Sequence, residues 1–343
     1  MEPVPPVPDV SDWRALYEFA DKQKIIGVTD PTKHDVRMGM EMTSQWFGAA
    51  LQIEYGNTLL NSRTVELSQY IREAGFRCCI LKGQGNAEMY PNPLSRTPGD
   101  IDVWVDADEE TIQEFVKERF PDARKSFKHI KFPVFNDVEV DMHETPLKLL
   151  RPRHQRQLQR WMDQKRDEQF SNSILLTGTN SYINVPTAGF NAVYQLGHIM
   201  IHLFDEGIGF RQLVDYFFVL KKLDGISREE RDEIIRTWKS LGMFRLARAV
   251  MWIEGKQLGL PEKCMLVVPD SRLGTVLLED VIEGGNFGQY SVRQQYSQGG
   301  KRMTRRVSTL VRLLKLSSCF PTEAFYWIIN RCINLWKSGK RRQ

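Results

Sequence analysis

The sequence lacks the features that would place the chain outside ordinary globular proteins. It has no run of about 18 apolar residues, so we expect no transmembrane helix. Residues 1–9 are proline-rich and acidic, without the basic and apolar regions of a secretory signal. There is no internal repeat or low-complexity tract. Hydrophobic residues at 41% and charged residues at 26% exclude a disordered or collagen-like chain.

Cysteine is scarce, and its spacing argues against a metal or disulfide framework. The 343 residues contain five cysteines: Cys78, Cys79, Cys264, Cys319 and Cys332. No pair has the spacing of metal ligands, and two of the cysteines are adjacent. We therefore predict reduced cysteines in a cytoplasmic protein, most of them filling the core.

Charge is distributed unevenly along the chain. Residues 301–343 contain eleven Lys and Arg against the single acid Glu323, a net charge of +10, which leaves −6 for residues 1–300. A basic tail on an acidic body predicts an anionic partner, either nucleic acid or a membrane surface. A solvated helix face followed by a frayed terminus explains the same charges equally well.

Hydrophobic periodicity and turn residues divide the chain into three predicted segments. Residues 1–75 have apolar side chains at helical spacing and end at Gly75, a helix stop. Residues 76–187 contain short runs rich in β-branched and aromatic residues, separated by turns. Residues 188–343 are again helical and end in the basic tail. The pattern predicts an α+β fold, with a mixed core and an α-helical companion domain.

Three further elements are expected inside the middle segment. A helix over residues 109–119 lies between the second and third strands, a basic linker covers residues 148–166, and a hairpin covers residues 173–185. Three arginines of the linker fall on one helical face. Together with the basic tail they could contact the phosphates of an RNA.

Two carboxylates flank one apolar residue, as Asp100-Ile101-Asp102, at the start of an apolar strand. Side chains alternate across a strand, so both carboxylates share one face, while Ile101 and Val103 share the other. Adjacent carboxylates repel each other and need a counter-charge. A hard divalent cation such as Mg²⁺ is well suited to this role.

The third predicted strand carries a matching carboxylate. Glu139, Asp141 and His143 share one of its faces, and Val140 and Met142 share the other. If this strand lies beside the strand of Asp100, Asp141 completes a three-carboxylate cluster able to hold one or two metal ions.

A glycine-containing loop precedes the paired carboxylates. Lys82, Gly83, Gln84 and Gly85 close one strand and open a predicted helix, where glycine allows close backbone approach and a helix N-terminus attracts phosphate. Arg96 follows in a turn, where its guanidinium would either reach phosphate oxygens or brace the carboxylates.

These motifs together resemble the polymerase-β-type nucleotidyltransferase superfamily. The run LKG, then YP, then RxxGDIDVxV, then VDMH is similar in particular to a large bacterial nucleotidyltransferase family that carries LKG, RxxxDID and VDxH. The similarity extends more weakly through His198-x-x-x-His202, Arg211-x-x-x-Asp215 and the GGNFG run at residues 284–288.

The resemblance implies a polymerase-β-like core, a small mixed sheet with flanking helices, beside an α-helical domain. Asp100 and Asp102 would bind Mg²⁺ or Mn²⁺ and the triphosphate of an NTP. Asp141 would bind the catalytic metal or take the proton of the acceptor. The phosphates would lie against the loop around Lys82 and Gly83.

Features of the helical part have simpler interpretations. His198 and His202 share a helix face and, with His143, are expected at the cleft rather than as a separate metal site. Arg211 and Asp215 are predicted to form an intrahelical ion pair. The GGNFG run is expected to form a tight loop rather than to bind a ligand.

Three functions fit these residues. The first is metal-dependent transfer of an NMP from an NTP, with release of pyrophosphate, to a small molecule, a protein side chain or an RNA end. The second is a DxD glycosyltransferase using a nucleotide-sugar. The third is a non-catalytic nucleotidyltransferase-fold binding protein, which Gln84 supports because serine is common at its position in the superfamily.

Overall fold

The computed structural model of the chain describes residues 10–34, 36–123, 129–288 and 311–330, apart from residues 318 and 323. Within these ranges no helix combines the length and apolarity that a membrane crossing requires. Most of the basic tail, on which the prediction of an anionic partner rests, lies outside the described residues.

The centre of the fold is a four-stranded mixed sheet in the order β1-β2-β4-β3. Its strands are β1 (Cys78–Leu81), β2 (Ile101–Val105), β3 (Ile130–Lys131) and β4 (Val140–His143). β2 is antiparallel to β1 and parallel to β4, and β3 is antiparallel to β4. The predicted α+β class and small mixed sheet are confirmed, although β3 was not expected from the sequence.

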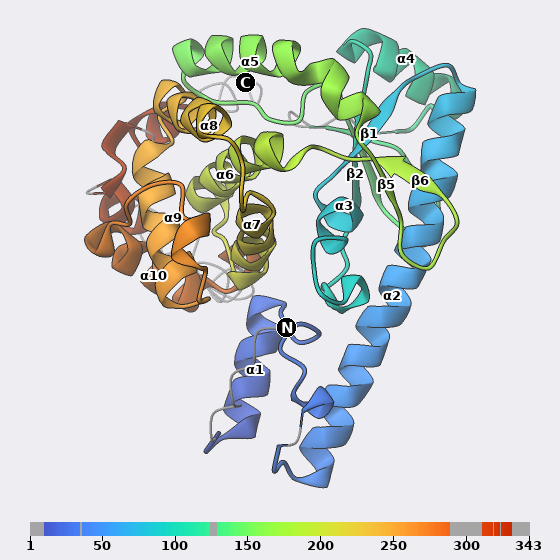
Figure 1. Cartoon of the computed structure of the whole chain (residues 1–343). Helices are drawn as coiled ribbons and strands as arrows, with labels where there is room; N and C mark the ends of the chain where they lie inside the picture. The colour runs from blue at the N-terminus through green and yellow to red at the C-terminus, as the bar shows by residue number, and fades with distance from the viewer. Residues whose placement is uncertain are drawn as a thin grey trace, which may run out of the picture.

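Helices and a hairpin cover one face of this sheet (Figure 1). α2 (Met40–Glu73) is 34 residues long and stops before Gly75, whose φ of +87° suits glycine. α4 (Glu109–Arg119) coincides with the predicted helix, and Asp108 caps it by accepting a hydrogen bond from Thr111 N at 2.8 Å. The hairpin of β5 (Ser173–Leu175) and β6 (Tyr182–Asn184) is also confirmed.

The segment predicted as a basic linker contains a helix, α5 (Pro152–Ser171). Proline at its first position costs no hydrogen bond, and a stripe of apolar side chains that includes Leu158 and Phe170 is buried. The helical face expected for its arginines is therefore present. The three arginines Arg153, Arg156 and Arg160 are exposed on its outer side.

The other face of the sheet packs against α5 and α6 (Ala188–Asp205), which Trp104 of β2 contacts. Further helices continue the same apolar cluster away from the sheet (Figure 1). They are α7 (Phe210–Lys222), α8 (Arg228–Ser240), α9 (Phe244–Lys256) and α10 (Ser271–Gly284), followed by helical residues at 311–317 and 324–330. Shorter elements complete the described chain: α1 (Trp13–Gln23), α3 (Gly83–Ala87) and the 3₁₀ turns η1 (Pro31–Lys33), η2 (Pro93–Ser95), η3 (Glu262–Cys264) and η4 (Asn286–Gly288).

Alternate side chains of β1 and β2 enter two different apolar clusters. Ile101, Val103 and Val105 of β2 pack with α2 and α4, whereas Trp104 packs with α5 and α6. The second cluster also contains residues from the N-terminal segment, including Trp46. The domain boundaries at residues 75 and 187 stay predictions.

The four described cysteines behave as the sequence predicted. Cys78, Cys79, Cys264 and Cys319 are buried and form no disulfide, so they fill the core. Burial raises the pKa of the Cys78 thiol to about 11, which keeps it protonated and unreactive at neutral pH.

Trp104 joins the sheet to the helical layer, so its removal should destabilise the whole fold. Its ring lies 5.8 Å from that of Phe190, and Nε1 donates to the Glu144 carbonyl at 2.8 Å. We expect Trp104→Ala to lower the free energy of unfolding by about 3–5 kcal/mol, measured by urea denaturation. Tyr55→Ala, at a side chain 77% exposed, is the control and should change it by less than about 0.5 kcal/mol. Equal effects of the two substitutions would contradict this assignment.

Candidate active site

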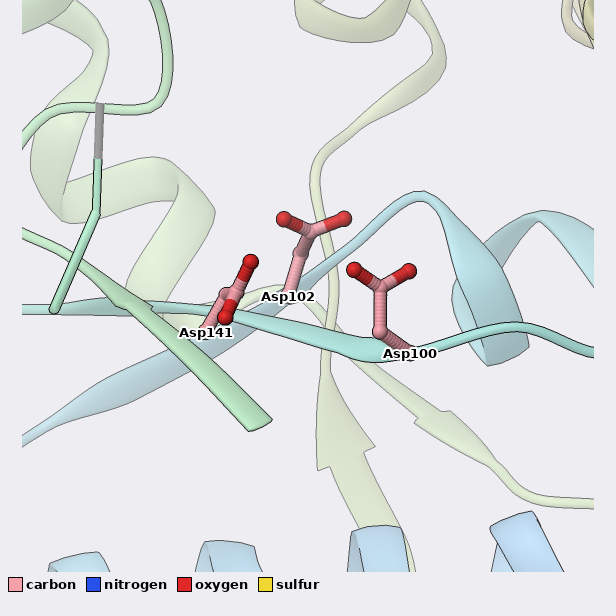
Figure 2. Close-up of side chains that lie close together, drawn as sticks. All are labelled: Asp100, Asp102 and Asp141. Atoms are coloured by element: carbon pink, nitrogen blue, oxygen red, sulfur yellow. The ribbon is translucent and has the colours of Figure 1, made fainter. Parts of the chain in front are cut away.

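The three predicted carboxylates meet at the ends of two neighbouring parallel strands. Asp102 of β2 lies opposite Asp141 of β4 in the strand register, and Asp100 immediately precedes β2. One carboxylate oxygen from each of the three residues lies within 4.8 Å of the others. Figure 2 shows the three side chains on the same side of the sheet. The expected neighbouring position of the third strand is therefore confirmed.

Strand alternation explains why these carboxylates face a cavity rather than the core. The flanking residues Ile101, Val103, Val140 and Met142 are all buried in the cluster under α2 and α4. The residues between them consequently point towards the helical layer that contains α6.

Asp102 is held by two basic side chains. Lys82 Nζ lies 2.7 Å from one carboxylate oxygen, and His143 Nε2 lies 2.7 Å from the other. Burial by itself would raise the pKa of Asp102. The nearby Lys82 and His143 outweigh burial and hold the pKa well below its usual range, so Asp102 is ionised at neutral pH.

Asp141 has a different environment. Lys131 Nζ lies 2.9 Å from its Oδ1, and His129 Nε2 lies 3.3 Å from its Oδ2. Burial raises the pKa of Asp141 above its usual value, and the charge of Asp100 adds to this shift. Lys131 and His129 were missed in the sequence because β3 is two residues long; their alternation around Ile130 was the only signal.

The donor set fits a hard divalent cation. Three carboxylates from Asp100, Asp102 and Asp141 supply oxygen ligands within reach of one another, and oxygen is the donor that Mg²⁺ and Mn²⁺ prefer. A bound cation would also offset the burial and the repulsion from Asp100 that together raise the pKa of Asp141.

Of the predicted phosphate loop, the side chain of Lys82 points into the site. Its backbone has φ +49°, an unusual value for a non-glycine residue, and its Nζ also lies 3.3 Å from His198 Nε2 on α6. Gln84 is buried and donates to Asn61 Oδ1 on α2. Gly85 packs on Val185, which a Cβ at this position would approach within 2.9 Å.

A cavity of about 660 Å³ adjoins the carboxylates. The histidines expected at the cleft, His143, His198 and His202, all line it, and so do His129 and His154. Its lining continues through Leu150, Phe204, Phe287, Tyr326 and Trp327, which are apolar or aromatic. The cavity therefore has a charged end at the carboxylates and an apolar wall. The GGNFG run forms the turn that places Phe287 there, with its ring 5.0 Å from that of His202.

Arg96 lies outside the lining of this cavity and is 3% exposed. Its Nε and Nη2 donate to the two oxygens of Asp215 at 2.8 and 2.9 Å, and Tyr90 donates to Asp215 Oδ1 at 2.5 Å. Burial would raise the pKa of Asp215, but Arg96 holds it below its usual value. The predicted ion pair of Asp215 with Arg211 was wrong, because Arg96 occupies both carboxylate oxygens.

Comparison with known proteins identifies the family. A family model described as uncharacterised nucleotidyltransferase matches residues 9–256, which is most of the chain. The protein belongs to this nucleotidyltransferase family. The matched region contains the three carboxylates, α6 and α7. No curated protein matches the sequence. Among solved structures, the chain is similar to an antigenic nucleotidyltransferase-like protein from Paracoccidioides brasiliensis, with 12% identity and a TM-score of 0.37, over 62% of this chain and 95% of that one.

The ion pairs around the three carboxylates predict a measurable titration. Lys82→Met removes the cation that most lowers the pKa of Asp102, so we expect that pKa to rise. A pH titration of the carboxyl carbon by ¹³C NMR measures it. Above the ordinary carboxyl pKa, ionised Asp102 stabilises the wild type. This contribution is lost as pH falls through the lower folded pKa, and Lys82→Met should reduce it.

Lys131→Met is the matched control, since Lys131 contacts Asp141 instead. It should raise the pKa of Asp141 and leave that of Asp102 nearly unchanged. Indistinguishable titrations of Asp102 in wild type and Lys82→Met would show that Lys82 does not neutralise this carboxylate.

Proposed function

We propose that the protein is a metal-dependent nucleotidyltransferase that moves an NMP from an NTP to an acceptor and releases pyrophosphate. The observation that carries this proposal is the meeting of Asp100, Asp102 and Asp141 on neighbouring parallel strands, in a chain of a nucleotidyltransferase family. The family supports nucleotidyl transfer over the glycosyltransferase alternative.

In the proposed site, Asp100 and Asp102 would hold Mg²⁺ or Mn²⁺ with the triphosphate, and Asp141 would complete the set of ligands. The bound cation would neutralise charge on the phosphates and orient them for displacement. Lys82 lies between Asp102 and His198, so its ammonium is placed to contact phosphate oxygens that enter beside Asp102.

The transfer step balances with groups present in the site. A hydroxyl or amine of the acceptor attacks the α-phosphorus, and the bond from this phosphorus to the bridging oxygen of pyrophosphate breaks. The acceptor's proton passes to the carboxylate of Asp141, which acts as the general base. The remaining work is positioning and charge neutralisation.

The other residues of the predicted nucleotide site receive supporting roles. Gln84 fixes α3 against α2, and the absence of a side chain at Gly85 allows Val185, just after β6, to approach. Arg96 braces the turn before Asp100 through Asp215 rather than contacting substrate. Gly83 follows Lys82 in the loop. The space beside its Cα is open, and the nearest atom to a Cβ placed there would be the carbonyl oxygen of Asp100 at 3.8 Å.

One observation favours the non-catalytic alternative. Lys82, His143 and Lys131 already contact the carboxylates of Asp102 and Asp141. The chain's own cations therefore compensate the like charges, and retention of the carboxylates does not by itself require a metal. Binding of NTP separates the two functions.

Thermal stabilisation by each of the four NTPs, with and without Mg²⁺, tests the proposal. We expect at least one NTP to stabilise the protein in a Mg²⁺-dependent manner, by about 2.7 kcal/mol at a concentration one hundred times its dissociation constant. Asp100→Asn/Asp102→Asn should abolish the effect. Asp232→Asn, an exposed carboxylate on α8, is the matched control and should retain it.

Two outcomes of the same experiment would contradict nucleotidyl transfer. A nucleotide-sugar that stabilises the protein where no NTP does would support the glycosyltransferase, and stabilisation by neither would support the non-catalytic protein. Where an NTP binds, α-labelled nucleotide then identifies the acceptor by the label it receives.

A further inference from the structure

Two arginines lie at the turn that leads into Asp100, and only one of them is paired. Arg96 uses Nε and Nη2 on Asp215, and its Nη1 donates to the Thr97 carbonyl at 3.3 Å. Each of the three nitrogens of this guanidinium therefore donates a hydrogen bond within the protein, and the buried side chain of Arg96 is committed to Asp215 and the turn.

Arg211 presents the opposite case. Its side chain, on the first turn of α7, is half-buried. It makes no hydrogen bond and no ion pair with any described residue. The guanidinium lies against Gly99, since a Cβ at Gly99 would come within 2.8 Å of its Nη2. An arginine with unused donors thus lies beside Gly99, the residue that precedes Asp100.

The neighbouring carboxylates leave the donors of Arg211 unused. Arg96 takes both oxygens of Asp215, and Arg211 is attracted by Asp215 and Asp100 but forms no hydrogen bond with either. Tyr90 is neutral because burial raises its pKa well above the usual value. Burial and the charge of Arg96 lower the pKa of Arg211 to about 10, so it remains a cation at neutral pH. A half-buried guanidinium without a hydrogen-bond partner favours the binding of an anion that accepts from it.

The position next to Asp100 restricts which anion fits. Asp100 is exposed and would repel a simple carboxylate or a protein's acidic side chain. A polyphosphate that carries its own divalent cation avoids this repulsion, because the cation lies against Asp100 and oxygens further along the chain are available to Arg211. The planar guanidinium can then bind two phosphate oxygens together.

We infer that Arg211 binds the polyphosphate tail of the nucleotide, on the side of Asp100 away from the transferred group. This inference rests on the proposed nucleotidyl transfer and adds a phosphate-binding residue that neither the DxD motif nor the loop at Lys82 supplies. It also gives a use for the room at Gly99, where a side chain would displace the guanidinium.

Calorimetric titration with inorganic tripolyphosphate and Mg²⁺ tests the inference without base, sugar or acceptor. We expect Arg211→Gln to weaken tripolyphosphate binding at least about tenfold, because charged hydrogen bonds are lost. Arg211→Lys keeps the charge but not the paired donors and should lose less. Arg236→Gln, at an exposed arginine of α8, is the matched control and should bind like the wild type.

The outcomes separate this inference from the proposed function. If Arg211→Gln binds tripolyphosphate as the wild type does, the role of Arg211 is overturned while nucleotidyl transfer stands. If the wild type binds neither tripolyphosphate nor any NTP, the proposed function itself fails. Should Arg211→Gln not fold, Arg211→Lys decides, and unchanged affinity in that variant overturns the inference.

Discussion

The parallel pairing of β2 with β4 places like charges side by side, and the surrounding side chains compensate these charges. The register sets Asp102 opposite Asp141, with Asp100 one residue before the strand. Carboxylates this close raise one another's free energy unless cations compensate them. The chain supplies such cations from two elements, Lys82 after β1 and Lys131 on β3, and His143 on β4 forms a hydrogen bond with Asp102.

The site is held from both faces of the sheet. Apolar residues of β2 and β4 are fixed against α2 and α4, which leaves Asp102 and Asp141 facing the helical layer. Trp104 then ties β2 to α5 and α6, and Lys82 reaches His198 on α6. The sheet thus supplies the charges, and the helices supply the apolar wall of the cavity.

Much of the site could be predicted from the sequence because its information is local. The two-residue period places carboxylates on one strand face, and capping at Asp108 marks the start of α4. Features that depend on distant residues were not predictable. β3 is too short for a pattern, and the Arg96–Asp215 pair spans 119 residues. There the local spacing of Arg211 and Asp215 suggested a pair that the fold does not form.

The central claim is that Asp100, Asp102 and Asp141 together hold a divalent cation that carries the phosphates of an NTP. The most direct measurement is a crystal structure with Mn²⁺ and a non-hydrolysable NTP, using anomalous scattering to locate the metal. We predict a Mn²⁺ peak between the three carboxylates, with the ammonium of Lys82 moved from Asp102 towards a phosphate oxygen. A nucleotide bound elsewhere, or carboxylates still paired only with Lys82, His143 and Lys131 and without Mn²⁺, would contradict the account.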